Sequence, residues 1–167
     1  CEPNVPGLLD FVLYCASDAI NDEKLYDKKT SRTLMYGIGY DVLYKFQKQQ
    51  IKVINEQGIF QPPHDFEHLR KCADKYISQG VKMGEGWLLT AEMLELLDSG
   101  VNNIVCTQPF GCLPNHICGR GMIRKIKEGN PGANIVAIDY DASATKVNQE
   151  NRLKLMLATG RNLAKAQ

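Results

Sequence analysis

One short loop carries the residues whose types and spacing suggest chemistry. Residues 106–116 read Cys-Thr-Gln-Pro-Phe-Gly-Cys-Leu-Pro-Asn-His, so two thiols, Cys106 and Cys112, precede the imidazole of His116. A thiolate is both a nucleophile and a metal ligand, and imidazole serves as a ligand or as an acid–base group near neutral pH. The Pro and Gly residues restrict the backbone, which favours a fixed loop. Metal binding and thiol chemistry are therefore the two functions to weigh.

Two runs of β-branched residues position this loop. Residues 103–107 (Asn-Ile-Val-Cys-Thr) and 134–138 (Asn-Ile-Val-Ala-Ile) predict strands, and residues 115–128 between them predict a helix that ends near Gly129. A strand–helix–strand order over about thirty residues predicts two parallel strands with a right-handed crossover. The loop then runs from the carboxyl end of a strand into the start of a helix. In open α/β sheets, ligands bind at that edge.

The helix start also bears on the chemistry of the two thiols. The positive end of a helix dipole lowers the pKa of a nearby thiol, so we expect Cys106 and Cys112 to ionise most readily. Simple burial at a strand end is the competing interpretation for Cys106. Five residues separate the two cysteines, which is wider than the knuckles of structural zinc sites. Two sulfurs do not complete a four-thiolate cluster, so further ligands would come from elsewhere.

The other candidate residues have weaker patterns. Cys15 and Cys72 lie among apolar residues of predicted helices, where packing in the core is expected, and Cys118 falls on the first turn of the helix after the loop. Cys1 is terminal and receives no role. Glu85 stands between two glycines, which suits either a carboxylate that approaches a ligand closely or a plain tight turn.

The rest of the chain reads as helical, with Asp65 as the cap of one short helix. Asn21 and Asp22 are expected to interrupt the first helix. Apolar periodicity predicts the longer helices over residues 9–20, 34–54, 88–97 and 143–157. We therefore expect an α/β fold of three layers, helix–sheet–helix, with a small parallel sheet and a helix-rich N-terminal half.

Length and strand number guide the domain assignment. We expect a single α/β domain over 1–167, helical over about 1–100 and with the βαβ unit over about 101–160. Two strands are few for a parallel sheet that must be covered on both faces. The chain is therefore expected to be a C-terminal fragment of a larger multidomain protein.

Composition excludes several function classes. The 167 residues include 20 Lys and Arg against 19 Asp and Glu, a formal net charge of +1. This near-neutral balance argues against general binding of nucleic acid or of acidic lipid surfaces. No apolar run approaches the ~18 residues of a membrane span, and the first residues lack the pattern of a signal peptide. We expect a cytoplasmic location, where the six cysteines would be thiols or ligands rather than disulfides.

Several strings of the sequence resemble one family. They lie at residues 84–93, 99–116, 133–141 and 147–156, and the most specific is the Gln-Pro-Phe-Gly-Cys-Leu-Pro-Asn-His that ends at His116. They are similar to the C-terminal region of acyl-CoA dehydratase activase-related proteins. In these CoA-substrate-specific enzyme activases, ATPase domains precede a region like the 2-hydroxyacyl-CoA dehydratase subunits.

The resemblance implies an iron–sulfur protein of anaerobic metabolism, with a 4Fe–4S or larger cluster held by cysteines from separate lobes. An ATP-driven activase would supply a low-potential electron for the dehydration or reduction of CoA thioesters. Carried onto this chain, Cys112 is the first metal ligand and Cys106 the second. The surroundings of the substrate or cluster would include Glu85, Gln108, Asn115 and His116. ATP would bind only in domains outside this chain.

The implied partners are the remaining domains of the same polypeptide and an acyl-CoA substrate, with no nucleic acid and no membrane. The chain alone is expected to be inactive. Two other classes of function stay open. One is a redox or nucleophilic cysteine enzyme that uses Cys112 and His116, and the other is a non-catalytic α/β interaction domain.

Overall fold

The computed structural model describes residues 3–28, 30–141 and 145–165, with side chains as far as residue 162. The chain divides into two compact units, Cys1–Leu88 (unit 1) and Leu89–Gln167 (unit 2). Unit 1 is helical in the residues described, and unit 2 contains the sheet. The α/β, helix-rich fold expected from the sequence is confirmed.

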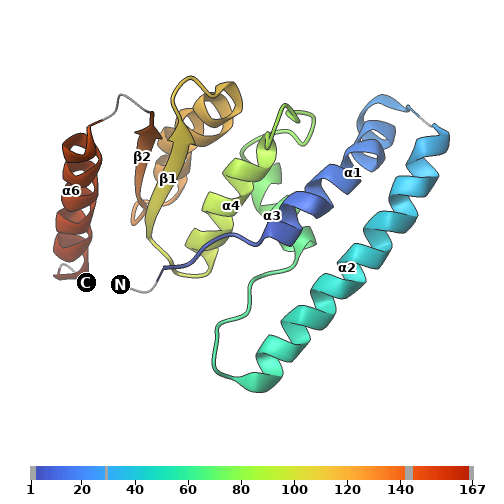
Figure 1. Ribbon diagram of the computed structural model, residues 1–167, viewed down its shortest axis with the longest axis horizontal. Coiled ribbons are helices and arrows are strands. Elements are labelled where there is room, and N and C mark those ends of the chain that lie inside the picture. The colour runs from blue at the N-terminus through green and yellow to red at the C-terminus, as the bar shows by residue number, and fades with distance from the viewer. Residues whose placement is uncertain (1–2, 29, 142–144, 166–167) are drawn as a thin grey trace. The chain divides into compact units, whose positions relative to one another are not determined.

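Two long helices form a hairpin in unit 1 (Figure 1). Helix α1 covers Leu8–Tyr26 and helix α2 covers Ser31–Gln57. The predicted break at Asn21 and Asp22 is wrong, because α1 continues through both residues. Their side chains find partners elsewhere in unit 1: Asn21 accepts a hydrogen bond from Arg70, and Asp22 pairs with Lys82. Polar residues that are satisfied in this way have no need to end the helix.

Helix α3, Phe66–Asp74, begins as predicted. The backbone N–H of His68 donates to Oδ1 of Asp65 at 2.9 Å, which satisfies one of the unpaired donors of the first turn. Gln47 of α2 joins three helices, since its amide donates to Asp10 of α1 and accepts from the N–H of Phe66. The apolar core of unit 1 includes Leu13, Phe66, Leu69, Ala73 and Trp87.

Helix α4, Trp87–Asp98, matches its predicted range closely, and the boundary between the units falls in its first turn. Trp87 is fully buried, with its ring 5.4 Å from the ring of Tyr14 and 5.9 Å from that of Phe66. The turn before it has φ +60° at Gly84 and +47° at Gly86, conformations that favour glycine.

Unit 2 is built on two parallel strands, β1 (Asn103–Pro109) and β2 (Asn134–Tyr140). Each strand is two residues longer than predicted at its C-terminal end, and the predicted parallel pairing is confirmed. The register runs from Asn103 opposite Asn134 to Pro109 opposite Tyr140.

Helices cover both faces of this sheet. On one face, Asn134 donates to the carbonyl of Met156 in α6, which spans Lys146–Lys165. On the other face, the sulfur of Cys106 lies 3.1 Å from where a Cβ atom of Gly119 would be. The segment 115–129 therefore covers the face opposite α6. Helix α4 joins this second layer, since Thr90 donates to the carbonyl of Cys118 at 2.6 Å.

The crossover itself departs from the predicted regular helix over 115–128. It begins as a π-helix, η1 (Asn115–Gly119), tightens into the 3₁₀ turn η2 (Arg120–Met122) and ends as α5 (Ile123–Gly129). Close backbone approach explains part of this irregularity, because a Cβ atom at Gly121 would lie 2.9 Å from the carbonyl oxygen of His116. Single turns of π-helix occur often at functional sites.

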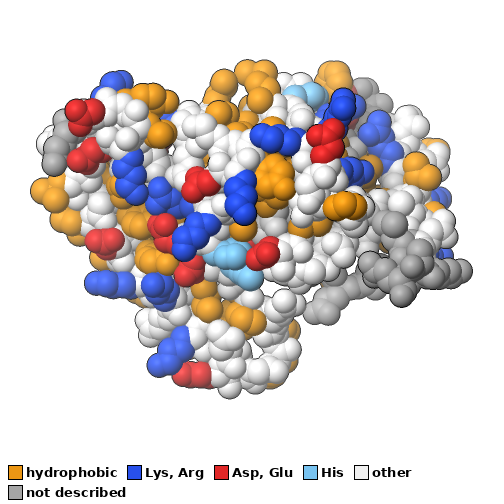
Figure 2. All heavy atoms as spheres, turned by 180° about the vertical axis from the view of Figure 1, so that it is seen from behind, with side chains coloured by type: hydrophobic (Ala, Val, Ile, Leu, Met, Phe, Trp, Pro, Cys, Tyr) orange, Lys and Arg blue, Asp and Glu red, His pale blue; other side chains and the backbone are white. Residues whose placement is uncertain are grey.

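The surface mixes both signs of charge. On the face seen in Figure 2, Lys and Arg side chains alternate with Asp and Glu, and apolar side chains lie between them. Among the described residues, none of the helices combines the length and the apolar character needed to cross a membrane.

Candidate functional site

Cys112 lies in a loop that backbone hydrogen bonds hold in place. Its N–H donates to the carbonyl of Pro109 at 3.2 Å, and its own carbonyl accepts the N–H of His116 at 3.0 Å. The sulfur accepts a hydrogen bond from Nδ2 of Asn115 at 3.1 Å, and the side chain is half-buried. The thiol therefore has a defined position at the carboxyl edge of the sheet, where a strand passes into a helix.

His116 is oriented by the backbone of the same cysteine. Its Nδ1 lies 2.8 Å from the carbonyl oxygen of Cys112, and a carbonyl can only accept a hydrogen bond. Nδ1 therefore carries the proton, and in the neutral ring the lone pair belongs to Nε2. Histidines that bind metals through Nε2 are commonly held in this way.

Cys106 has a different environment. It is half-buried on the sheet face that η1 covers. Burial raises the pKa of its thiol, and the negative charges of Glu92 and Asp139 raise it further. The expectation that the helix dipole lowers this pKa is wrong. Cys106 is a strand residue rather than part of the first helical turn, to which the dipole effect is confined.

Gln108 is the unusual polar residue of this face. It is 1% exposed, and its Nε2 donates to a carboxylate oxygen of Asp139, whose other oxygen lies 3.5 Å from Nη1 of Arg120. The Oε1 atom of Gln108 is buried and has no hydrogen-bond partner among the described residues. Leaving a buried acceptor unpaired costs about 1 to 3 kcal/mol, so this atom is available to a donor from a ligand, a water molecule or another segment.

Three large apolar side chains of the thiol loop and of η1 are exposed. Phe110 is 72% exposed, Leu113 52% and Ile117 50%. They lie two residues before, one residue after and five residues after Cys112 in the chain. Clustered exposed apolar residues often mark an interaction surface.

The remaining candidates do not gather around Cys112. Within the described part of unit 2, no three Cys, His, Asp or Glu side chains bring their ligand atoms within 4.8 Å of one another. Cys118 is buried in η1, and burial raises the pKa of its thiol. Glu85 lies in unit 1, in the turn between two glycines of positive φ. Cys1 lies outside the described residues.

The two helical cysteines of unit 1 differ from each other. Cys72 is half-buried, whereas Cys15 is exposed, so the prediction of core packing for Cys15 is wrong. The buried face of α1 is formed by Leu13, Tyr14, Ala16 and Ser17. This pattern leaves Cys15 on the outer side of the helix.

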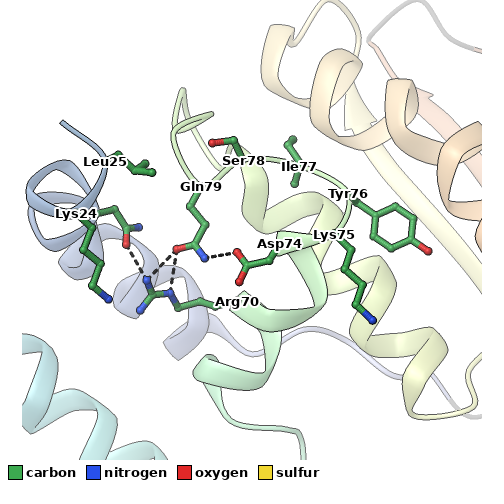
Figure 3. Close-up of a pocket in the computed structure, with 10 residues that line it drawn as sticks. Lys24, Leu25, Arg70, Asp74, Lys75, Tyr76, Ile77, Ser78 and Gln79 are labelled. Atoms are coloured by element: carbon green, nitrogen blue, oxygen red, sulfur yellow. Dashed lines mark hydrogen bonds between the residues drawn. The ribbon is translucent and has the colours of Figure 1, made fainter.

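Unit 1 has a cleft that the sequence did not suggest. Its volume is about 630 Å³, and it is lined by the end of α1, by α3 and by the loop 75–79. Figure 3 shows Arg70 at its centre, bonded to Gln79, which in turn bonds to Asp74. Arg70 is only 9% exposed. Its position four residues after Phe66 and three before Ala73, on the apolar stripe of α3, is the signal that could have predicted this burial.

Thiol reactivity provides a test of the site geometry. We expect iodoacetamide near pH 7 to modify Cys112 faster than Cys106 or Cys118, because burial raises the pKa of both of those thiols and so lowers the fraction of each that is present as thiolate. Mass spectrometry of peptides from timed samples measures the three rates. Cys112→Ser should remove the fast signal and leave the other two rates unchanged. Equal rates at Cys106 and Cys112 would contradict this description.

Comparison of the chain with protein-family models, with curated proteins and with solved structures finds no match.

Proposed function

We propose that unit 2 is a cysteine-bearing lobe of an iron–sulfur protein, with Cys112 as its first cluster ligand and Cys106 as its second. The cluster would serve low-potential electron transfer in an ATP-dependent, activase-related system that dehydrates or reduces CoA thioesters. The observation that carries the proposal is the half-buried sulfur of Cys112, held between a strand end and a helix start and bonded to Asn115.

The surroundings of Cys112 suit a thiolate ligand. An N–H···S hydrogen bond such as that from Asn115 stabilises negative charge on the sulfur, and such bonds tune the reduction potential of iron–sulfur clusters. His116 keeps Nε2 as a lone-pair donor, which adds a possible ligand atom to the loop. Gln108, four residues before Cys112 in the chain, offers a buried acceptor.

The ligand set has to be shared with another part of the protein. A cubane cluster takes four thiolates, and the described residues of unit 2 do not bring even three ligand groups together. The exposed Phe110 and Leu113 beside Cys112 give such a second lobe an apolar surface to cover. ATP binding belongs to domains other than the two units described.

Cys106 ranks second because its surroundings disfavour the thiolate. Burial, and then the charges of Glu92 and Asp139, oppose a negative charge on its sulfur in the metal-free protein. A bound iron ion would reverse this balance, since a cation favours the thiolate strongly. Cys106 is thus expected to bind iron only once Cys112 and the outside ligands hold the cluster.

Iron binding tests the proposal directly. The longest available polypeptide that contains this chain would be purified without oxygen and reconstituted with ferrous iron and sulfide. We expect about four iron atoms or more per chain, with thiolate-to-iron charge-transfer absorption. Cys112→Ala should lose most of this iron, whereas Cys15→Ala, which removes an exposed thiol of unit 1, should keep it. Full iron content in Cys112→Ala would overturn the assignment.

Iron content and the alkylation rate of Cys112 together separate the other two functions. Fast alkylation of Cys112 in a protein that binds no iron would favour a cysteine enzyme that uses Cys112 and His116. The contact between Nδ1 of His116 and the Cys112 carbonyl, rather than the sulfur, makes that pairing less direct. Inert thiols together with no iron would favour an interaction domain.

A further inference from the structure

A groove follows the outer edge of the sheet in unit 2. Its volume is about 620 Å³. It runs along residues 135–137 of β2, with η2 and α5 on one side and Arg152 of α6 on the other. Ile123 and the strand residues give it an apolar floor. The groove therefore lies between the two helical layers, where a further strand of the sheet would stand.

The backbone of β2 presents hydrogen-bonding groups to this groove. In a parallel strand, successive residues point their N–H and C=O groups to opposite sides. The N–H of Asn134 bonds to the carbonyl of Asn102, and the carbonyl of Tyr140 accepts the N–H of Phe110, so the even-numbered residues of β2 face β1. Residues 135, 137 and 139 consequently face outward, along the groove.

Side chains of α6 occupy two of these outward groups. Nη1 of Arg152 donates to the carbonyl of Ala137 at 2.8 Å, and Nε2 of Gln149 donates to the carbonyl of Asp139 at 3.4 Å. An incoming backbone N–H can replace a long side chain in such a bond. The guanidinium of Arg152 would then be released for a carboxylate of the incoming chain.

The charges of the groove select the partner. Arg120, Arg124, Lys127 and Arg152 line it, together with Glu128, which pairs with Arg124 at 2.9 Å. Asp139 does not line the groove, but its carboxylate lies 3.5 Å from Arg120, so the cations still outnumber the acids by four to two. We propose that this groove binds an extended, acidic segment of a partner protein as a third strand of the sheet. Main-chain bonds to residues 135 and 137 would provide the pairing, and carboxylates would meet the four cations.

A second copy of the chain fits less well. Pairing of two β2 edges would bring both sets of four cations together, and like charges across an interface are costly. The acidic segment instead neutralises them. The proposal is independent of the cluster, because Cys112 does not line the groove.

Peptide binding tests the proposal with the protein as described. The probe is a dye-labelled peptide of about eight residues that alternates valine with glutamate, followed by fluorescence anisotropy at about 50 mM salt. We expect Arg124→Glu combined with Lys127→Glu to weaken binding about tenfold or more. The matched control is Lys125→Glu, a charge reversal on the same helix outside the groove, and it should change affinity less than about twofold.

Two further probes separate strand addition from attraction of charge alone. N-methylation of every peptide amide keeps the carboxylates but removes the backbone donors on both edges of the peptide, and it should abolish binding. Hydrogen exchange should slow at the amides of Ile135 and Ala137 when peptide binds, and stay unchanged at Val136 and Ile138. Equal binding of the N-methylated peptide, of a lysine-for-glutamate peptide or of a single-stranded oligonucleotide would overturn the proposal. So would a stable dimer of the free chain that protects the same amides.

Discussion

Replacing Arg70 with methionine is expected to lower the free energy of unfolding of unit 1 by about 3 kcal/mol. The guanidinium donates to Glu67 at 3.0 Å, to Asn21 at 2.9 Å and, through two nitrogens, to Gln79 at 3.0 and 2.9 Å. Methionine fills much of the volume but leaves these acceptors unpaired, and the Asn21 side chain is buried. The expected loss of about 3 kcal/mol is at the lower end of the range for breaking a buried ion pair, because the side chain of Glu67 is 38% exposed.

Urea denaturation followed by the fluorescence of Trp87 measures this effect, since Trp87 is the one tryptophan of the chain and lies in unit 1. Lys71→Met makes the same change at the next position, where the side chain is exposed. It should shift stability by less than about 0.5 kcal/mol. Equal stability of the two variants would contradict the role given to Arg70.

A pH series strengthens the same test. Burial raises the pKa of Glu67, but the hydrogen bond from Tyr40 and the charge of Arg70 outweigh it, so the net pKa is below its ordinary value. Because the pKa of Glu67 is lower in the folded protein than its ordinary value of 4.5, ionised Glu67 stabilises the fold above about pH 4.5. This stability is lost as the pH falls through the pKa of the folded state. Arg70→Met removes part of that lowering, so its stability should depend less on pH in this acid range.

Gly86→Ala is the second substitution with a large expected effect, a loss of about 3 kcal/mol or more from unit 1. Gly86 has φ +47°, and an added Cβ would lie 2.2 Å from the carbonyl oxygen of Val81 and 2.7 Å from the hydroxyl of Tyr14. Left-handed backbone costs a non-glycine residue about 1 to 2 kcal/mol, and overpacking adds about 1 to 3. The turn also carries the bond from the N–H of Trp87 to Val81, at 2.8 Å, which has to move.

Thermal unfolding and the near-ultraviolet circular dichroism of Trp87 together report this loss. Gly39→Ala is the matched control, because Gly39 lies within α2 and a Cβ there meets nothing within 4 Å. In that helical position alanine should stabilise by about 0.5 to 1 kcal/mol. If Gly86→Ala unfolds at the same temperature as the protein with glycine at this position, the turn is looser than described.

The elements that the sequence predicted well are those with a strong local pattern. The two β-branched runs became strands, and Asp65 caps its helix, because neighbouring residues decide both outcomes. The break expected at Asn21 failed because its partner, Arg70, lies 49 residues away along the chain. A local pattern contains no information about such a partner.

Part of the candidate site could be predicted from local sequence, and part depends on residues that lie far apart in the chain. The position of Cys112 after a strand and before a helix could be predicted from spacing. The raised pKa of Cys106 could not, since it depends on burial and on charges from Glu92 and Asp139. The unpaired oxygen of Gln108 depends on strand register, which places Asp139 opposite it.

The two edges of the sheet are unequal, and the last residue of β1 contributes to this. The alternation that turns residues 135 and 137 toward the groove also turns Pro109 away from β2, toward the opposite edge. Proline has no N–H to donate, so a chain that approached that edge would find a gap in the ladder at its carboxyl end. Pairing with a further strand is therefore disfavoured beside β1, because of the proline, relative to the edge of β2 that borders the cationic groove. A fold with so small a sheet would thereby limit edge-to-edge aggregation, since one edge ends at a proline and the other has two of its carbonyls bonded to Arg152 and Gln149.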